Sequence, residues 1–164
     1  MTRVTTAGQL LYALGTSKEI EVDGSLSGMP AITLPPGTRL RGGTLRFAAR
    51  GVRLTADNQL EDVTVIAPDR EVALASSTPD LGQLVLRNVR TRGQVLLTAS
   101  RGHVAVDGLT VASADLRGRE DRPHGFGVDV LPGAFTLWNR SGDPGLTATL
   151  AGISAGTADA PVRG

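Results

Sequence analysis

A short motif recurs along this chain: an apolar residue, a charged or small residue, then Gly, Asn or Asp, then another apolar residue. Copies occupy residues 60–63, 86–89, 106–109 and 150–153, and a version with extra length occupies residues 40–45. The first residues of successive copies are 20, 26, 20 and 44 residues apart, the last step being two periods of 22. A period of this length is typical of solenoids, in which each repeat packs against its neighbours.

The third position of the motif explains why it recurs. It is filled by residue types that tolerate a positive φ, namely Gly42 or Gly43, Asp62, Asn88, Gly108 and Gly152. One left-handed residue between two strands produces a sharp bend, whereas an α-helical repeat would place a poor helix former inside each copy. The preceding position alternates in charge, through Arg41, Glu61, Arg87 and Asp107. The motif therefore predicts a corner that is stacked from repeat to repeat, with opposite charges next to one another.

Apolar residues alternate with other residues between the corners, which predicts short β-strands. Three strand families can be aligned. The first contains the pairs Val52/Leu54, Val72/Leu74, Val95/Leu97 and Val128/Val130, the second leads into the corner with Leu84/Leu86 and Val104/Val106, and the third leaves it with Leu45/Phe47, Val63/Val65, Val89/Thr91 and Leu109/Val111. Three strands per repeat predict a three-sided prism.

The amino terminus has a different period. Thr6 and Gln9 form the pattern of a capping box, Leu10, Leu11 and Leu14 follow at helical spacing, and Gly15 is expected to end the helix. We predict one domain over residues 1–164, with a capping helix at 5–15, β coils at 19–156 and a flexible tail at 157–164. Because the strand rhythm still runs at residues 150–153 and nothing resembling a cap follows, we also predict that this is the amino-terminal part of a longer coil.

This combination of an amino-terminal helix and three-sided coils with Gly or Asn at a corner resembles the right-handed parallel β-helix proteins of the pectate-lyase-like superfamily. The segment 32–42, with Gly37-Thr38 before the first corner, looks like an early coil of that group. The resemblance implies an all-β fold: a right-handed, single-stranded parallel β-helix, or solenoid, of about six coils with a short capping α-helix. It does not extend to catalytic motifs, because the carboxylate clusters of the polysaccharide lyases and hydrolases of this fold have no counterpart here.

Composition excludes several classes of function. The chain has no Cys, so it forms no disulfide, and it carries 17 basic and 16 acidic residues, which gives no electrostatic case for nucleic acid. No secretory signal or apolar stretch of membrane-spanning length is present, so we predict a soluble cytoplasmic protein with no membrane partner. We predict no cofactor and no metal.

Two local groups are candidate sites. His124 stands close to Glu120 and Asp121 in a charged segment and is the best candidate for acid–base chemistry, although a solvated loop holding mixed charges explains the same pattern. Trp138 next to Arg140 is a candidate sugar-stacking platform, or a side chain covered by the preceding segment. His103, which precedes a strand, is expected in an exposed turn.

The first functional hypothesis is a non-catalytic β-helix scaffold or interaction module, with self-association or further coils at an open carboxyl-terminal end. The alternative is a carbohydrate-active or sugar-binding β-helix protein that uses His124, the charged residues Glu120, Asp121 and Arg122, and Trp138. A third hypothesis is a self-assembling structural β-helix. The repeats do not distinguish between these three hypotheses, because they specify the conformation of the backbone and not the chemistry of a site.

Overall fold

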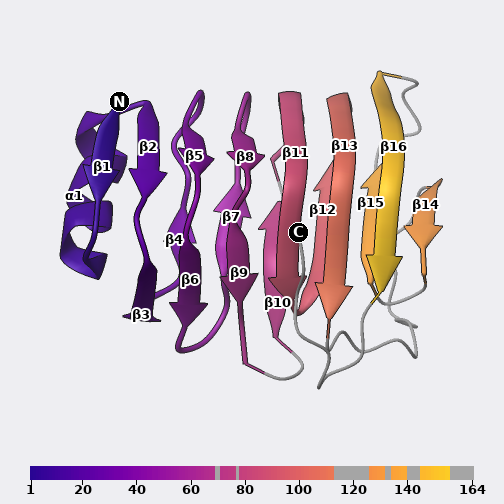
Figure 1. Cartoon of the computed structure of the whole chain (residues 1–164). Coiled ribbons are helices and arrows are strands. Elements are labelled where there is room, and N and C mark those ends of the chain that lie inside the picture. Colours follow the sequence, from indigo (N-terminus) through magenta and orange to yellow (C-terminus); the bar gives the residue numbers. More distant parts are fainter. Residues whose placement is uncertain (69–70, 77, 113–125, 132–133, 140–144, 156–164) are drawn as a thin grey trace.

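The structure, a computed structural model, describes residues 1–68, 71–76, 78–112, 126–131, 134–139 and 145–155. Nearly all of the regular structure in these residues is β, with one helix near the amino terminus. The strands form two sheets in which neighbouring strands run parallel, except at one edge (Figure 1). The predicted all-β class with parallel strands is therefore confirmed. The predicted tail at residues 157–164 lies outside the described residues.

Sheet A contains ten strands and bends at the predicted corner. In the early repeats the corner separates two strands, and in the later repeats one long strand passes through it. The strands before the corner are β1 (Thr2–Val4), β2 (Glu19–Val22), β5 (Arg39–Arg41) and β8 (Gln59–Glu61), those after it are β3 (Ser25–Met29), β6 (Thr44–Phe47) and β9 (Thr64–Ile66), and the long ones are β11 (Asp80–Arg92), β13 (Arg101–Ala112) and β16 (Leu146–Ala155).

Sheet B closes the other side with six strands. In spatial order they are β14 (Phe126–Val130), β15 (Phe135–Asn139), β12 (Gln94–Ala99), β10 (Val72–Ser76), β7 (Val52–Leu54) and β4 (Ile32–Thr33). The chain alternates between the two sheets as it proceeds, so that each pass adds strands next to those of the previous pass. The core lies between the sheets and is filled by the inward-facing Leu, Val and Ile side chains of both.

The corner behaves as the sequence predicts. The φ angles are +79° at Gly42, +55° at Asp62, +51° at Asn88, +84° at Gly108 and +67° at Gly152. Successive corners also stack, because Leu40 pairs with Leu60, Leu60 with Leu86, Leu86 with Val106 and Val106 with Leu150. A left-handed residue at the same place in each pass is therefore what bends sheet A.

Two of the predicted strand families are wrong in part. Val52 pairs with Leu74 and not with Val72, and Leu45 pairs with Val65 and not with Val63, so both alignments are two residues out of register.

The first family is also wrong in its last member. Val52 pairs with Leu74 and Leu74 with Val95, but the next strand in parallel register is β15, where Phe135 pairs with Val95. The pair Val128/Val130 instead lies in β14, which runs antiparallel to β15 at the edge of sheet B. Both strands alternate apolar residues with a period of two, and that pattern does not encode the direction of the strand.

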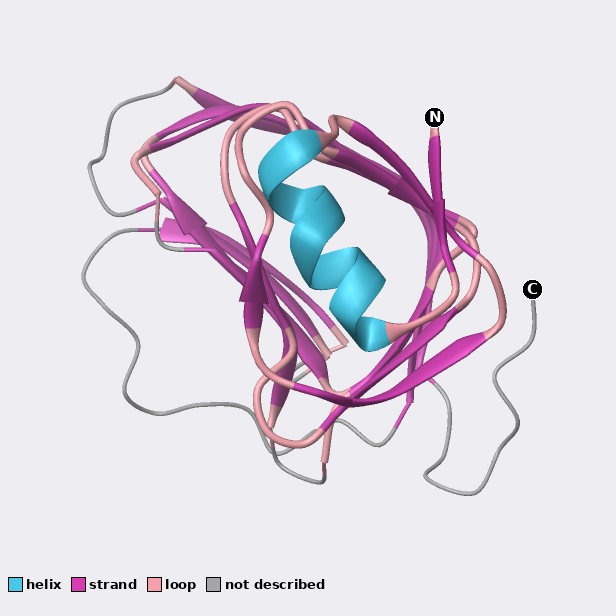
Figure 2. Cartoon of the chain, turned by 90° about the vertical axis from the view of Figure 1, so that its left-hand side faces the viewer, coloured by secondary structure: helices cyan, strands magenta, loops and turns pink. Residues whose placement is uncertain are grey.

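Helix α1 (Ala7–Thr16) covers the amino-terminal end of the core (Figure 2). Thr6 is its N-cap: the Thr6 hydroxyl accepts a hydrogen bond from the Gln9 amide at 3.1 Å, and the Gln9 side chain accepts one from the Thr5 amide at 2.7 Å. The helix extends past Gly15, one residue beyond the predicted end, because the Ser17 amide donates to the Ala13 carbonyl and completes the last turn. In the described part of the chain, no helix has the length and hydrophobicity needed to cross a membrane.

Candidate interaction surface

The most distinctive surface of the molecule is the free edge of β16. Within the described residues this strand pairs with β13 on one side and with no strand on the other. Its ten residues include no charged side chain and no proline. Exposed strand edges present unpaired N–H and C=O groups, and proteins usually protect them with charged residues, proline or a short strand. β16 has none of these protections in its own sequence, and in the described part of the chain no strand pairs with its second edge.

The core is accessible next to this edge. Val106 and Leu109 of β13 face inward and are 2% and 0% exposed, whereas Leu150 and Ile153, their register partners in β16, are only half-buried. Paired residues in neighbouring strands point to the same side of the sheet, so Leu150 and Ile153 also face the core. Among the described residues, no element covers the core at β16 in the way that α1 covers it at the other end.

Sheet B contributes apolar surface at the same end. Val128 of β14 is 42% exposed although its partner Leu137 in β15 is 4% exposed, and Leu131, which follows β14, is 41% exposed. β14, β15 and β16 lie together at the end of the molecule opposite α1 (Figure 1). We call this surface the open end and define it by Val128, Val130, Leu131, Leu146, Leu150 and Ile153.

The contrast with the helical end supports this distinction. Leu10 and Ala13 of α1 are buried against the first strands, and only Leu11 and Tyr12 on the outer side of the helix are exposed. At the amino-terminal end the core therefore lies beneath a helix, whereas at the open end the described inward-facing residues of β16 are only half-buried.

His103 holds β16 against β13. Its Nδ1 lies 2.7 Å from the Thr147 hydroxyl oxygen and its Nε2 lies 3.3 Å from the Thr149 hydroxyl oxygen. The expectation that His103 belongs to an exposed turn is wrong, because it lies inside β13 and is half-buried beneath the two threonines of the edge strand. The contact fixes the outward face of β16 and leaves its free edge untouched.

The outward face of sheet A carries the predicted charge ladder. Arg41, Glu61, Arg87 and Asp107 are register neighbours in that order, and the ladder begins earlier than predicted, because Arg3 pairs with Glu21 and Glu21 with Arg41. Two of its neighbouring pairs form ion pairs, Arg3 with Glu21 at 3.5 Å and Arg87 with Glu61 at 4.0 Å.

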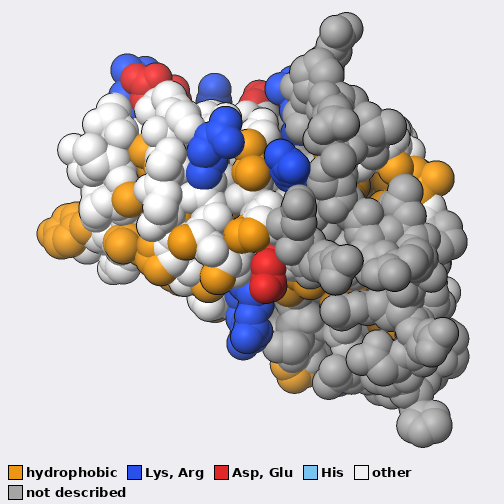
Figure 3. Space-filling view, turned by 90° about the horizontal axis from the view of Figure 1, so that it is seen from below, with side chains coloured by type: hydrophobic (Ala, Val, Ile, Leu, Met, Phe, Trp, Pro, Cys, Tyr) orange, Lys and Arg blue, Asp and Glu red, His pale blue; other side chains and the backbone are white. Residues whose placement is uncertain are grey.

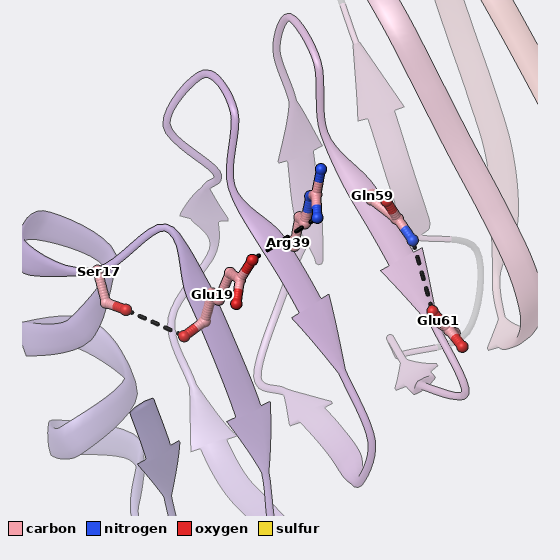
Figure 4. A network of polar contacts seen from close by, with 5 residues as sticks. All are labelled: Ser17, Glu19, Arg39, Gln59 and Glu61. Atoms are coloured by element: carbon pink, nitrogen blue, oxygen red, sulfur yellow. Dashed lines mark hydrogen bonds and ion pairs between the residues drawn. The ribbon is translucent and has the colours of Figure 1, made fainter. Parts of the chain in front are cut away.

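A parallel row lies beside the ladder. Arg39 pairs with Glu19 at 3.6 Å, and the Gln59 side chain donates to Glu61 at 3.4 Å (Figure 4). A shallow groove of about 240 Å³ runs between the two rows. Within its lining Glu19 contacts Arg39 and Gln59 contacts Glu61, so we interpret this groove as the space between two rows of charged and polar side chains.

Charged groups elsewhere are also distributed in small sets. In the view from below, basic and acidic side chains form separate small groups among uncharged and hydrophobic residues (Figure 3). Among the described residues, no group of three or more His, Asp or Glu side chains is arranged to hold a metal ion.

Of the residues predicted as sites, the structure describes only Trp138. The other candidates, His124, Glu120, Asp121 and Arg140, lie outside the described residues, so the acid–base hypothesis stays an untested prediction. Trp138 lies on the outward face of sheet B, half-buried, with its ring against the backbone of Gly127: a Cβ at Gly127 would come within 2.9 Å of a ring carbon. One part of the Trp138 ring thus packs on β14, and its use as a sugar platform remains a prediction.

The open end was only partly anticipated from the sequence. The strand rhythm through residues 146–153 was visible, but the stronger signal is that residues 146–155 contain no charged residue, in a chain where one residue in five is charged. Val128 and Leu131 were missed because an antiparallel edge strand has the same alternation as a buried one.

Comparison with known proteins adds no assignment: no family model, curated protein or solved structure matches this chain. The candidate surface therefore rests on the geometry described above.

Proposed function

We propose that this chain is a right-handed parallel β-helix and that it works as a non-catalytic scaffold whose open end binds a partner. The register supports the first part, because equivalent residues of sheet A pair at steps of 20, 20, 26, 20 and 44 residues through residues 20, 40, 60, 86, 106 and 150. Crossovers between parallel strands of one sheet are right-handed in nearly all proteins, which supports the handedness. A relationship to the pectate-lyase-like superfamily is part of the same proposal.

One observation carries the proposed role: the charge-free edge of β16 lies beside half-buried core residues. An edge of this kind favours β-augmentation, in which an added strand supplies the missing main-chain hydrogen bonds and its side chains cover the exposed apolar surface. The rest of sheet A serves as a support whose strands are joined on the outward face by three ion pairs, Arg3 with Glu21, Arg39 with Glu19 and Arg87 with Glu61.

Hydrogen exchange tests the availability of the edge. We expect the β16 amides that point away from β13 to exchange rapidly at nanomolar protein concentration, because no described strand accepts their hydrogen bonds. The amides of β13, which has a paired strand on both sides, should be protected. Strong protection of all β16 amides under these conditions would mean that the edge is already covered within the chain, and would overturn the proposed binding role.

A panel of acidic and neutral polysaccharides tests the non-catalytic role against the carbohydrate-active alternative. We expect no cleavage with or without Ca²⁺, and no change of the melting temperature on adding Ca²⁺. Cleavage of any member of the panel, or calcium-dependent stabilisation, would overturn the scaffold proposal in favour of an enzyme.

A further inference from the structure

The corner in β16 allows the open end to pair with a copy of itself. We propose that it binds the open end of a second copy of this chain, with the two β16 strands antiparallel across a two-fold axis. This inference rests on the proposed role of the open end as a binding surface and adds the identity of what binds there.

The corner at Gly152 determines how two such strands can pair. Before the corner, Leu146, Ala148 and Leu150 are register partners of the inward-facing side of β13, and after it the inward positions are Ile153 and Ala155. The corner thus shifts the alternation by one residue. The corner divides β16 into two arms. When two copies of β16 pair antiparallel about a two-fold axis, the arm before the corner of one copy lies next to the arm after the corner of the other. Inward residues then face inward residues along the whole strand only if both corners lie on the axis.

That register is chemically self-consistent. It places the Ala151–Gly152 corner of each copy on the axis, so that the bends of the two strands match. Apolar residues then lie opposite apolar residues and hydroxyls opposite hydroxyls, with no charge on either strand. The resulting pairs are Leu150 with Ile153 of the second copy, Ala148 with Ala155 of the second copy, and Thr149 with Ser154 of the second copy.

The apolar surface of the open end supports the same arrangement. Leu150 and Ile153 would complete a core layer with their counterparts, and Val128 and Leu131 on the sheet B side would be covered by the same contact. A head-to-tail contact would instead set the open end against α1, where the core is already covered by Leu10 and Ala13. Identical surfaces that complement one another close into a dimer, whereas head-to-tail contacts continue into filaments.

The first experiment measures oligomeric state by analytical ultracentrifugation between 0.1 and about 100 µM, a range that covers the usual affinities of specific dimers. We expect a reversible dimer. Ala151→Lys should raise the dissociation constant at least about tenfold, since it places two like charges beside the axis. The control, Gln83→Lys, adds the same charge at an exposed position of β11 and should leave dimerisation unchanged.

Charge reversal makes this test specific. The Ala151→Asp variant alone should also be monomeric. An equimolar mixture of Ala151→Lys and Ala151→Asp should form heterodimers, because one positive and one negative side chain then lie beside each two-fold axis. Failure of the mixture to associate, with both variants folded by circular dichroism, would overturn the two-fold arrangement. A wild-type chain that stays monomeric, or that forms filaments, would overturn it as well.

Disulfide crosslinking tests the register of the two β16 strands. The chain contains no cysteine, so only the introduced cysteines can form a disulfide. The double variant Thr149→Cys/Ser154→Cys should form a disulfide-linked dimer on oxidation, since the two positions face each other across the axis. They cannot join within one chain, because five residues of strand separate them by about 16 Å. The matched control, Thr147→Cys/Ser154→Cys, also removes one His103 contact but is two residues out of register, and should crosslink far less.

Equal crosslinking of the two variants would overturn the proposed register. These results are also separable from the proposed function. A monomeric chain with a rapidly exchanging β16 edge and no polysaccharide cleavage removes the second copy as partner and leaves the scaffold intact, whereas polysaccharide cleavage removes the scaffold function whatever the oligomeric state.

Discussion

At the scale of single residues, the corners of sheet A depend on side chains that tolerate a left-handed backbone. Asn88 has a φ of +51°, and its side-chain amide donates to the Asp62 carboxylate at 2.7 Å, which links two consecutive corners. We expect Asn88→Ala to lower the free energy of unfolding by about 1–2 kcal/mol, because alanine has a steric cost in this conformation.

Asn88→Gly is the control for this prediction. It relieves the backbone cost and loses only an exposed hydrogen bond, so its effect should stay within about 1 kcal/mol. Urea unfolding followed by circular dichroism measures both. Equal destabilisation by the two variants would show that the hydrogen bond, and not the backbone, sets the requirement for Asn at this corner.

Gly51 is required for a different reason. Its φ is not left-handed, but a Cβ at this position would overlap the carbonyl oxygen of Ala73 in the next strand of sheet B. We expect Gly51→Ala to destabilise the protein by about 1–3 kcal/mol, since the backbones must move apart. Gly8→Ala, which has nothing within 4 Å in the first turn of α1, should instead stabilise by up to about 1 kcal/mol. Thermal unfolding compares their signs, and destabilisation by both would contradict the crowding argument.

These residues also show what the sequence reveals at this scale. The corner positions were predictable because one backbone conformation restricts the choice to Gly, Asn and Asp, and the restriction recurs with the repeat. The need for Gly51 was not predictable, because it arises from Ala73, 22 residues away, and nothing local marks so close an approach.

At the scale of elements, α1 is fixed by its first turn. The Thr6 hydroxyl accepts the N-cap hydrogen bond from the Gln9 amide, and the helix packs its own Leu10 and Ala13 against the core. Thr6→Ala should therefore cost about 1 kcal/mol of stability, and Thr6→Ser, which keeps the hydroxyl, should cost much less. Denaturant unfolding measures both, and amide exchange in residues 7–16 should rise only in Thr6→Ala. Identical behaviour of the two variants would rule out the cap as the cause.

The charge ladder joins consecutive strands of sheet A. Arg41 lies between Glu21 and Glu61 in register, at the strand spacing of about 4.8 Å. Arg41→Glu would place three carboxylates in a row and should destabilise by about 0.5–1 kcal/mol at low salt, while Arg41→Gln should cost less. The difference between the two variants should shrink in 0.5 M NaCl, because these groups are exposed and salt screens them. A difference that is independent of salt would mean that packing, not charge, is responsible.

The elements at the open end limit what can be predicted from sequence. Alternation with a period of two located β14 and β15. It could not show that Phe135 pairs with Val95 in the core, or that Val128 belongs to an antiparallel strand at the edge of the sheet. Strand direction and edge position depend on the path of the connecting segment. The sequence marks β16 only as an alternating segment without charged residues, and the meaning of its edge depends on the half-buried Leu150 and Ile153, which the sequence alone does not show.

At the scale of the whole molecule, the repeat implies that stability is distributed over neighbouring passes of the chain. Leu40 occupies the same inward position as Ile20 and Leu60, so removing residues 40–59 would bring Ile20 directly over Leu60. The same step brings Leu26 over Val65 and Ile32 over Leu74. A chain shortened by one whole pass therefore keeps its inward residues inward in both sheets.

We expect the variant lacking residues 40–59 to fold, with β-type circular dichroism and a single cooperative transition at a lower melting temperature, because each pass contacts only its neighbours. Its urea m-value should fall by about one-eighth, in proportion to the lost surface. The matched control lacks residues 40–49, which sets strands of different sheets against one another and should prevent cooperative folding. If the longer deletion were as disruptive as the shorter one, stability would depend on contacts that span the whole molecule, and the passes would not be equivalent units.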